Sequence, residues 1–139
     1  MTIPMVPPAP PQRPPLPDRL TALAALAAAT ALIRVAPLRF TLTTARLAKR
    51  AARHPATAPE AARLLAARDW AGQFFPGRAA CLEMSLAAFL AVCLRGHAVD
   101  WCIGCRFDPC ESHAWIEADK EPVCEPQVPD RPFHLTLRV

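Results

Sequence analysis

The sequence predicts an α+β domain in which helices come first along the chain and a small antiparallel sheet follows. Two observations lead to this prediction. Up to Gly96, apolar residues recur at helical spacing, and Pro or Gly residues divide this part of the chain into separate helical stretches. After Gly96, short β-prone segments are separated by turn residues such as Asp119-Lys120. We therefore expect a central helix that carries a cysteine and packs on a small sheet.

The chain begins with a proline-rich arm. Eight of its 17 prolines fall within residues 1–17, where the missing N–H donors and fixed φ angles exclude a helix or a sheet. We predict that this arm is disordered or polyproline-like. The remaining residues, 18–139, suffice for one hydrophobic core. We expect a single domain there, with a helical front at residues 18–75 and a second part at residues 76–139.

Capping and breaking residues bound the expected helices. Asp18 precedes the first apolar run and is expected to cap it. Thr57 and Glu60 have the spacing of a capping box, and Gly96 is typical of a helix C-terminus. The fourth helix has a broad apolar face, so we expect it to be central and buried. The expected helices are residues 19–35, 38–53, 58–74 and 81–95.

Alternation and turn signals mark the expected strands. His113, Trp115 and Glu117 fall on one face of a strand. Ala114, Ile116 and Ala118 fall on the other face. A two-residue connection then predicts a hairpin. The expected strands are residues 98–107, 113–118, 121–125 and 133–139.

Charge is distributed unevenly along the chain. Residues 1–80 carry a net charge of +8, and residues 81–139 carry −4. Part of the basic excess recurs on one side of the second helix, at Arg46, Lys49, Arg50 and Arg53. This face suits an acidic protein or lipid surface. No aromatic residue is interleaved with these cations, so a nucleic-acid platform is not expected.

Cysteine content and apolar runs indicate the compartment. The most apolar stretch, residues 20–33, is shorter than the roughly 20 residues that span a bilayer. It also follows a proline arm rather than the short basic start of a signal peptide. We therefore expect a cytoplasmic protein with reduced thiols and no membrane partner. The sequence contains neither dinucleotide nor P-loop motifs, so no cofactor is predicted.

A zinc site is an alternative role for some of the six cysteines. Cys102 and Cys105 have C-x-x-C spacing, and Cys110, Cys124 and His97 are further candidate ligands. On a strand, however, positions i and i+3 point to opposite faces, so one metal ion would not bind both. We expect no metal and assign these thiols to packing.

Three residues form a candidate catalytic constellation. Cys81 falls in the first turn of the fourth helix, where free N–H groups and the helix dipole favour a thiolate. His113 begins a strand and could serve as its base, and Glu125 could orient the imidazole. Glu117 and Asp119 remain alternatives for this carboxylate. From the pattern alone, purely structural roles for the cysteine and histidine also stay open.

Residues 76–123 resemble the B protein of lasso-peptide biosynthesis, a leader peptidase of the transglutaminase-like superfamily. The matching features are Gly77-Arg78-Ala79-Ala80-Cys81-Leu82, Ser85-Leu86-Ala87, Ile103-Gly104-Cys105-Arg106, His113-Ala114-Trp115-Ile116-Glu117 and Pro122-Val123. The resemblance implies a transglutaminase-like, papain-like fold with its catalytic core at residues 76–139. It also implies a cysteine peptidase whose triad is Cys81, His113 and Glu125.

The resemblance implies partners as well. Some members of that family carry an N-terminal winged-helix domain that binds the leader peptide, whereas this chain resembles the split, peptidase-only form. It would then act on the precursor peptide together with a separate winged-helix leader-binding protein. An asparagine synthetase-like cyclase would close the macrolactam ring of the freed peptide. The alternative function is a non-catalytic or zinc-stabilised scaffold that binds peptide or membrane through the basic helices.

The sequence departs from the family pattern at three positions. Met84 stands where a basic residue is common, Cys124 where Asn is frequent, and Glu125 where the third triad residue is usually Asp. A glutamate is one methylene longer than an aspartate but can still accept a hydrogen bond from an imidazole. We expect it to accept from Nδ1–H, as in a serine-protease triad.

Overall fold

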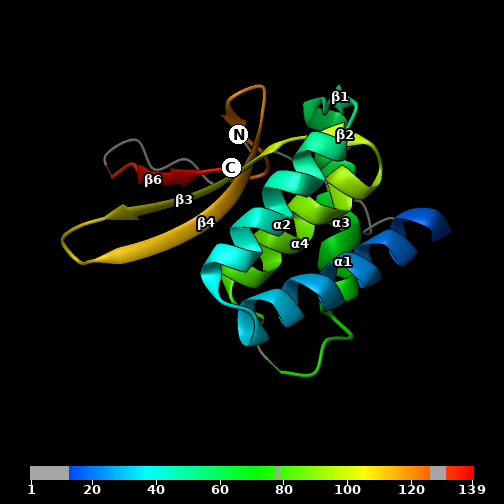
Figure 1. Ribbon diagram of the computed structural model, residues 1–139, viewed down its shortest axis with the longest axis horizontal. Coiled ribbons are helices and arrows are strands. Elements are labelled where there is room, and N and C mark those ends of the chain that lie inside the picture. Colours follow the sequence, from blue (N-terminus) through cyan, green and yellow to red (C-terminus); the bar gives the residue numbers. More distant parts are fainter. Residues whose placement is uncertain (1–12, 78, 126–130) are drawn as a thin grey trace, which may run out of the picture.

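The computed structural model describes residues 13–77, 79–125 and 131–139. Most of the predicted proline arm, residues 1–12, lies outside the described residues. Figure 1 shows a layer of helices beside a twisted antiparallel sheet, which confirms the predicted α+β class. The helices are α1 (Leu16–Val35), α2 (Leu38–Ala51), α3 (Ala58–Gly72) and α4 (Cys81–Leu94). The strands are β1 (His54–Pro55), β2 (His97–Ala98), β3 (Asp100–Arg106), β4 (Glu111–Ala118), β5 (Glu121–Pro122) and β6 (His134–Arg138).

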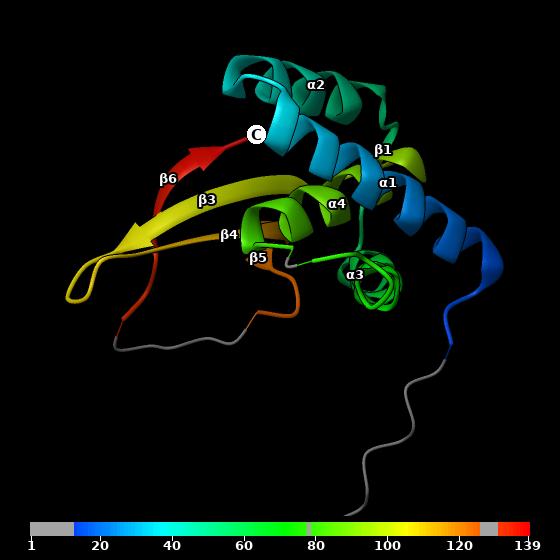
Figure 2. The ribbon, with the colours of Figure 1, turned by 90° about the horizontal axis from the view of Figure 1, so that it is seen from below.

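Helix α4 is the centre of the core. In Figure 2 it lies between α1 and β4, and it packs against α1, α3 and β4. Its middle is buried all round, with Leu86, Phe89 and Val92 fully covered. The buried face of α1 consists largely of alanines, and such small side chains allow the two helix backbones to approach closely. The prediction of a central, buried fourth helix is therefore confirmed.

The start of α1 differs from the prediction. The helix begins at Leu16, with Pro15 at the N-cap and another proline in the first turn, where a missing N–H has no consequence. Asp18 therefore lies inside the helix and makes no side-chain cap. Instead Asp18 is 2% exposed, and its carboxylate pairs with Arg63 at 3.1 Å and Arg95 at 3.8 Å. The predicted arm thus ends before residue 16 rather than at residue 17.

The length of α1 also corrects an expectation. Its 20 residues make it the one helix in the described parts of the chain that is long and apolar enough to cross a membrane, by length and composition only. Sequence inspection counted only residues 20–33 because polar residues flank them. In the structure 28% of that apolar window is buried, Asp18 pairs with Arg63, and α1 packs against α3 and α4.

Four strands form the main sheet in the order β5-β4-β3-β6, and each neighbouring pair is antiparallel. Asp119 and Lys120 form the predicted tight connection between β4 and β5, and both have positive φ angles. The returning strand is shorter than the predicted 121–125 because it ends at Pro122, and Cys124 with its positive φ turns the chain away. This turn brings the following residue, Glu125, back toward β4.

A second, two-stranded sheet was not predicted. β1 and β2 pair in parallel over only two residues each, His54 with His97 and Pro55 with Ala98. Segments this short show no alternation of apolar and polar residues, so sequence inspection has no signal for them. Their pairing ends α2 at Ala51 instead of the predicted residue 53. The predicted capping box of α3 is present, since Glu60 N–H donates to Thr57 Oγ1 and Thr57 N–H donates to Glu60.

Candidate active site

Cys81 is the first residue of α4, and its side chain is exposed. Ala80 at the N-cap has no polar side chain to cap the helix. The other half of a capping box is present, because the N–H of Ala80 donates to Glu83 Oε2 at 2.9 Å. The other oxygen of Glu83 accepts from Arg34 Nε of α1, also at 2.9 Å. The two contacts fix the beginning of α4, and with it Cys81, against α1. The guanidinium also balances the carboxylate charge next to the thiol.

The imidazole of His113 lies against the carboxylate of Glu125. His113 comes from β4, Glu125 from the segment after β5, and the distance between Nε2 and Oε2 is 2.8 Å. The expected contact at Nδ1 is therefore wrong. The turn after β5 brings the carboxylate to the tip of the ring, where Nε2 lies, and Nδ1 is left for another partner.

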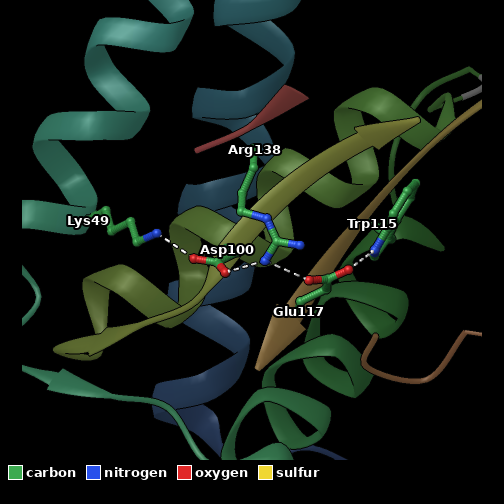
Figure 3. Close-up of polar contacts among 5 residues, drawn as sticks. All are labelled: Lys49, Asp100, Trp115, Glu117 and Arg138. Carbon is green, nitrogen blue, oxygen red and sulfur yellow. Dashed lines mark hydrogen bonds and ion pairs between the residues drawn. The ribbon is translucent and has the colours of Figure 1, made fainter. Parts of the chain in front are cut away.

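One pocket brings the three predicted residues together. Its volume is about 140 Å³, and Cys81, His113 and Glu125 all line it. Neither alternative carboxylate contacts His113 in the described residues. Glu117 accepts a hydrogen bond from Trp115 Nε1 and pairs with Arg138 (Figure 3), and Asp119 lies in the exposed turn between β4 and β5.

Two aromatic rings flank the imidazole. The ring of His113 is stacked on Trp115, with 5.9 Å between centroids and 20° between planes. Phe133 lies 5.3 Å from the imidazole and 6.2 Å from the indole. Alternation along β4 predicted that His113 and Trp115 share a face, and this is confirmed. The contribution of Phe133 was missed, because it comes from the far end of a segment whose position depends on the fold.

The pocket contains a cation that sequence inspection did not identify. Arg68 of α3 lines it with a side chain that is only 16% exposed. Its Nη1 donates to the carbonyl of Met84 on α4, and its Nη2 pairs with Asp69. Met84 lines the same pocket, so the position that departs from the family pattern is part of the wall. No local signal distinguishes Arg68 from the other arginines of the helical front, because tertiary packing alone directs it inward.

Ser85 connects the helical layer to the sheet. Its hydroxyl donates to the carbonyl of Leu82 at 3.1 Å and accepts from the buried Trp101 Nε1 of β3 at 2.9 Å. The serine in the motif that follows Cys81 therefore ties α4 to the neighbouring strand.

The packing role predicted for the other cysteines holds for Cys93 and Cys102, which are buried, but is wrong for Cys110 and Cys124, which are exposed like Cys81. All six lie in described segments and are free thiols. Burial raises the pKa of the Cys93 thiol to about 11 and that of Cys102 to about 12, so both are poor nucleophiles near neutral pH. Within residues 13–77, 79–125 and 131–139, no group of three or more His, Cys, Asp or Glu residues is arranged to hold a metal ion. The zinc alternative thus finds no ligand set there.

Comparison with known proteins gives one finding. A family model described as the transglutaminase-like superfamily matches residues 22–138, which include every residue of the pocket. No curated protein and no solved structure matches the chain.

Proposed function

The chain belongs to the transglutaminase-like superfamily, and we propose that it is a cysteine peptidase that removes the leader from a lasso-type precursor peptide. Enzymes with a catalytic cysteine are common in this superfamily. One observation carries the proposal: a pocket is lined by an exposed thiol at a helix N-terminus and by a His113–Glu125 pair at 2.8 Å. A nucleophile, a base and a group that orients the base are the parts that acyl transfer requires.

The proposed reaction proceeds through a thioester. The sulfur of Cys81 attacks the carbonyl carbon at the end of the leader, while Nδ1 of His113 takes the thiol proton. The C–N bond then breaks, and the imidazolium gives that proton to the departing amine of the core peptide. Water hydrolyses the thioester, which releases the leader as a carboxylic acid and restores the thiol. The backbone N–H of Cys81 at the start of α4 is placed to stabilise the oxyanion.

Glu125 has a defined part in this reaction. By accepting a hydrogen bond at Nε2, it holds the ring in the tautomer whose Nδ1 is free to accept a proton. It also stabilises the imidazolium that forms when the thiol is deprotonated. The contact at Nε2 supports our assignment of Glu125 in place of the more usual aspartate.

The resemblance of residues 76–123 to the lasso-peptide B proteins supports the choice of substrate. On this proposal, a separate winged-helix protein delivers the leader, and an asparagine synthetase-like cyclase takes the freed core peptide. The exposed basic residues of α2, Arg46 and Arg50, provide a surface for an acidic partner. We place the reaction in the cytoplasm, where six free thiols would stay reduced.

A non-catalytic scaffold is the second candidate. The observation in its favour is the outer surface of α2, where the exposed Phe40 and Leu47 lie on the same helix as exposed arginines. Such a mixed surface suits a bound peptide or a membrane surface. A scaffold would not need a thiol, an imidazole and a carboxylate at one pocket, so we favour the peptidase.

Replacing the nucleophile tests the proposal. The purified chain is mixed with a lasso-type precursor peptide and a winged-helix leader-binding protein, and cleavage is followed by mass spectrometry. We expect Cys81→Ala to abolish cleavage, with a loss of at least about 10³-fold. Cys110→Ala is the matched control, since that thiol is also exposed and free. Cleavage that survives in Cys81→Ala would exclude Cys81 as the nucleophile, whereas a lack of cleavage by the unaltered chain would favour the scaffold.

A further inference from the structure

A chain of polar contacts leads from α2 to the ring on which His113 stacks (Figure 3). Its members come from four elements: α2, β3, β6 and β4. None of them lines the pocket except the last, a tryptophan. In order, the members are Lys49, Asp100, Arg138, Glu117 and Trp115.

Each contact in this chain joins a donor to a carboxylate. The indole Nε1 of Trp115 donates to Glu117 Oε1 at 3.0 Å, and Nη1 of Arg138 lies 2.9 Å from Glu117 Oε2. The same Nη1 donates to Asp100 Oδ2 at 2.8 Å. Lys49 Nζ donates to the other oxygen of Asp100. Both oxygens of Asp100 thus accept a hydrogen bond, whereas Glu117 Oε2 is ion-paired with Arg138 but accepts no hydrogen bond among the described residues.

Glu117 is buried, and stability alone does not explain a buried ion pair at this position. Its side chain is 8% exposed, and its charge is balanced mainly by Arg138. A buried ion pair of this kind seldom adds net stability over apolar residues of the same size, because desolvation offsets the attraction. What it does provide is a defined orientation, since the carboxylate must face both the guanidinium and the indole N–H.

The indole is fixed at both ends. At one end Nε1 is held by Glu117, and at the other the ring lies over Gly104 of β3. A Cβ atom at Gly104 would come within 2.7 Å of Cη2 of Trp115, so only glycine leaves room for the ring there. The imidazole of His113 then stacks on this ring at 5.9 Å. The orientation of the indole ring therefore restricts the orientation of the imidazole ring that stacks on it.

From these contacts we infer that Glu117, held by Arg138, is a positioning residue for His113 and acts through the Trp115 ring. The inference rests on the proposed function, in which His113 deprotonates Cys81. Displacing the indole would tilt the imidazole away from the thiol, and small displacements of a base reduce the rate strongly.

Two substitutions test this inference. In Glu117→Gln, one of the two carboxylate oxygens becomes an NH2 donor, so either Trp115 Nε1 or Arg138 Nη1 faces a donor instead of an acceptor. In Trp115→Phe, a stacking ring remains but the N–H donor is lost. Asp18→Asn is the matched control, because it also turns a buried, arginine-paired carboxylate into an amide, but between helices.

Two readouts separate positioning from stability. The first is the rate at which iodoacetamide alkylates Cys81, measured across pH by mass spectrometry of the Cys81 peptide. The second is kcat and KM for leader cleavage. We expect both test variants to lower kcat about tenfold with little change in KM, and to move the alkylation profile of Cys81 to higher pH. Asp18→Asn should lower the thermal unfolding midpoint and leave the profile in place.

The possible outcomes distinguish this inference from the proposed function. An alkylation profile that both variants leave unchanged would overturn the positioning role, even if their stability falls. If the wild-type protein shows no cleavage but the profile still shifts in both variants, the positioning role stands and the choice of substrate fails. Should Glu117→Gln not fold, Trp115→Phe alone decides, because it leaves the ion pair between Glu117 and Arg138 intact.

Discussion

Asp100 is the residue at which α2, β3 and β6 are joined by charge. Burial raises the pKa of its carboxyl group. Hydrogen bonds from Lys49 and Arg138 lower that pKa by a larger amount, so the net pKa lies below its ordinary value of 3.8. A carboxylate with a lowered folded-state pKa stabilises the fold above the unfolded-state pKa. That stabilisation is lost as the pH falls through the lower, folded-state value.

Asp100→Asn should therefore destabilise the protein in a pH-dependent way. At neutral pH we expect the free energy of unfolding to fall by about 1–2 kcal/mol, because two charge-assisted hydrogen bonds are lost. At acidic pH, below the ordinary pKa of 3.8 and toward the lower folded-state pKa, the wild-type carboxyl is increasingly protonated, so the difference between the two proteins should shrink. Urea unfolding at both pH values measures this. A difference that stays constant with pH would mean that packing, not charge, is what Asp100 contributes.

At the scale of single elements, the cations of α2 have two roles: one forms an internal ion pair, and the others lie on an exposed surface. Its cations recur on one side, but the structure divides them: Lys49 is half-buried against Asp100, whereas Arg46, Arg50 and the following Arg53 are exposed. Only the exposed three remain as a docking surface. The lysine belongs to the internal network, so it should be left intact when docking is tested.

Reversing the three exposed charges should weaken docking of the leader-binding protein or the leader. For the triple variant Arg46→Glu, Arg50→Glu and Arg53→Glu we expect at least about tenfold weaker binding at low salt, because like charges would then face the proposed acidic partner. The difference should diminish as salt screens the surface. Isothermal titration calorimetry at two salt concentrations measures it. A control with Arg13→Glu and Lys120→Glu should bind normally, and unchanged affinity in the triple variant would refute the docking surface.

Elements with strong local signals were predictable, whereas elements defined by tertiary contact were not. The capping box at Thr57 and the tight turn at Asp119-Lys120 depend on neighbouring residues, so the sequence alone located them. Asp18 has the sequence of a cap, but prolines start the helix earlier and two arginines from other helices pair with it. Inspection at the residue level cannot anticipate partners that far along the chain.

The same distinction applies to the candidate site. The thiol, imidazole and carboxylate were selected in advance by residue type, spacing and family resemblance, and the structure places all three at one pocket. The contact at Nε2 was not foreseeable, because it follows from the backbone turn at Cys124. Arg68 and Phe133 were missed for the same reason, since each reaches the site from an element that only the fold brings close.

In the whole molecule, the site lies where the helical layer meets the sheet. Cys81 is contributed by α4, His113 by β4, and Glu125 by the segment after β5. The spacing between thiol and base therefore depends on the attachment of α4 to the sheet. One specific tie in that attachment is the buried hydrogen bond from Trp101 Nε1 to Ser85 Oγ.

Ser85→Ala should weaken this attachment and reveal whether the two layers form one cooperative unit. It leaves the indole N–H of fully buried Trp101 without its acceptor, which costs about 1–3 kcal/mol. If the layers fold together, far-ultraviolet circular dichroism, dominated by the helices, and tryptophan fluorescence should report one shared transition that moves to lower urea in the variant. Ser112→Ala, an exposed serine on β4, is the matched control and should leave the midpoint in place. Separate transitions for the two probes would instead mean that the helical layer persists without the sheet, and the geometry of the site would then depend on a docking equilibrium between two independent units.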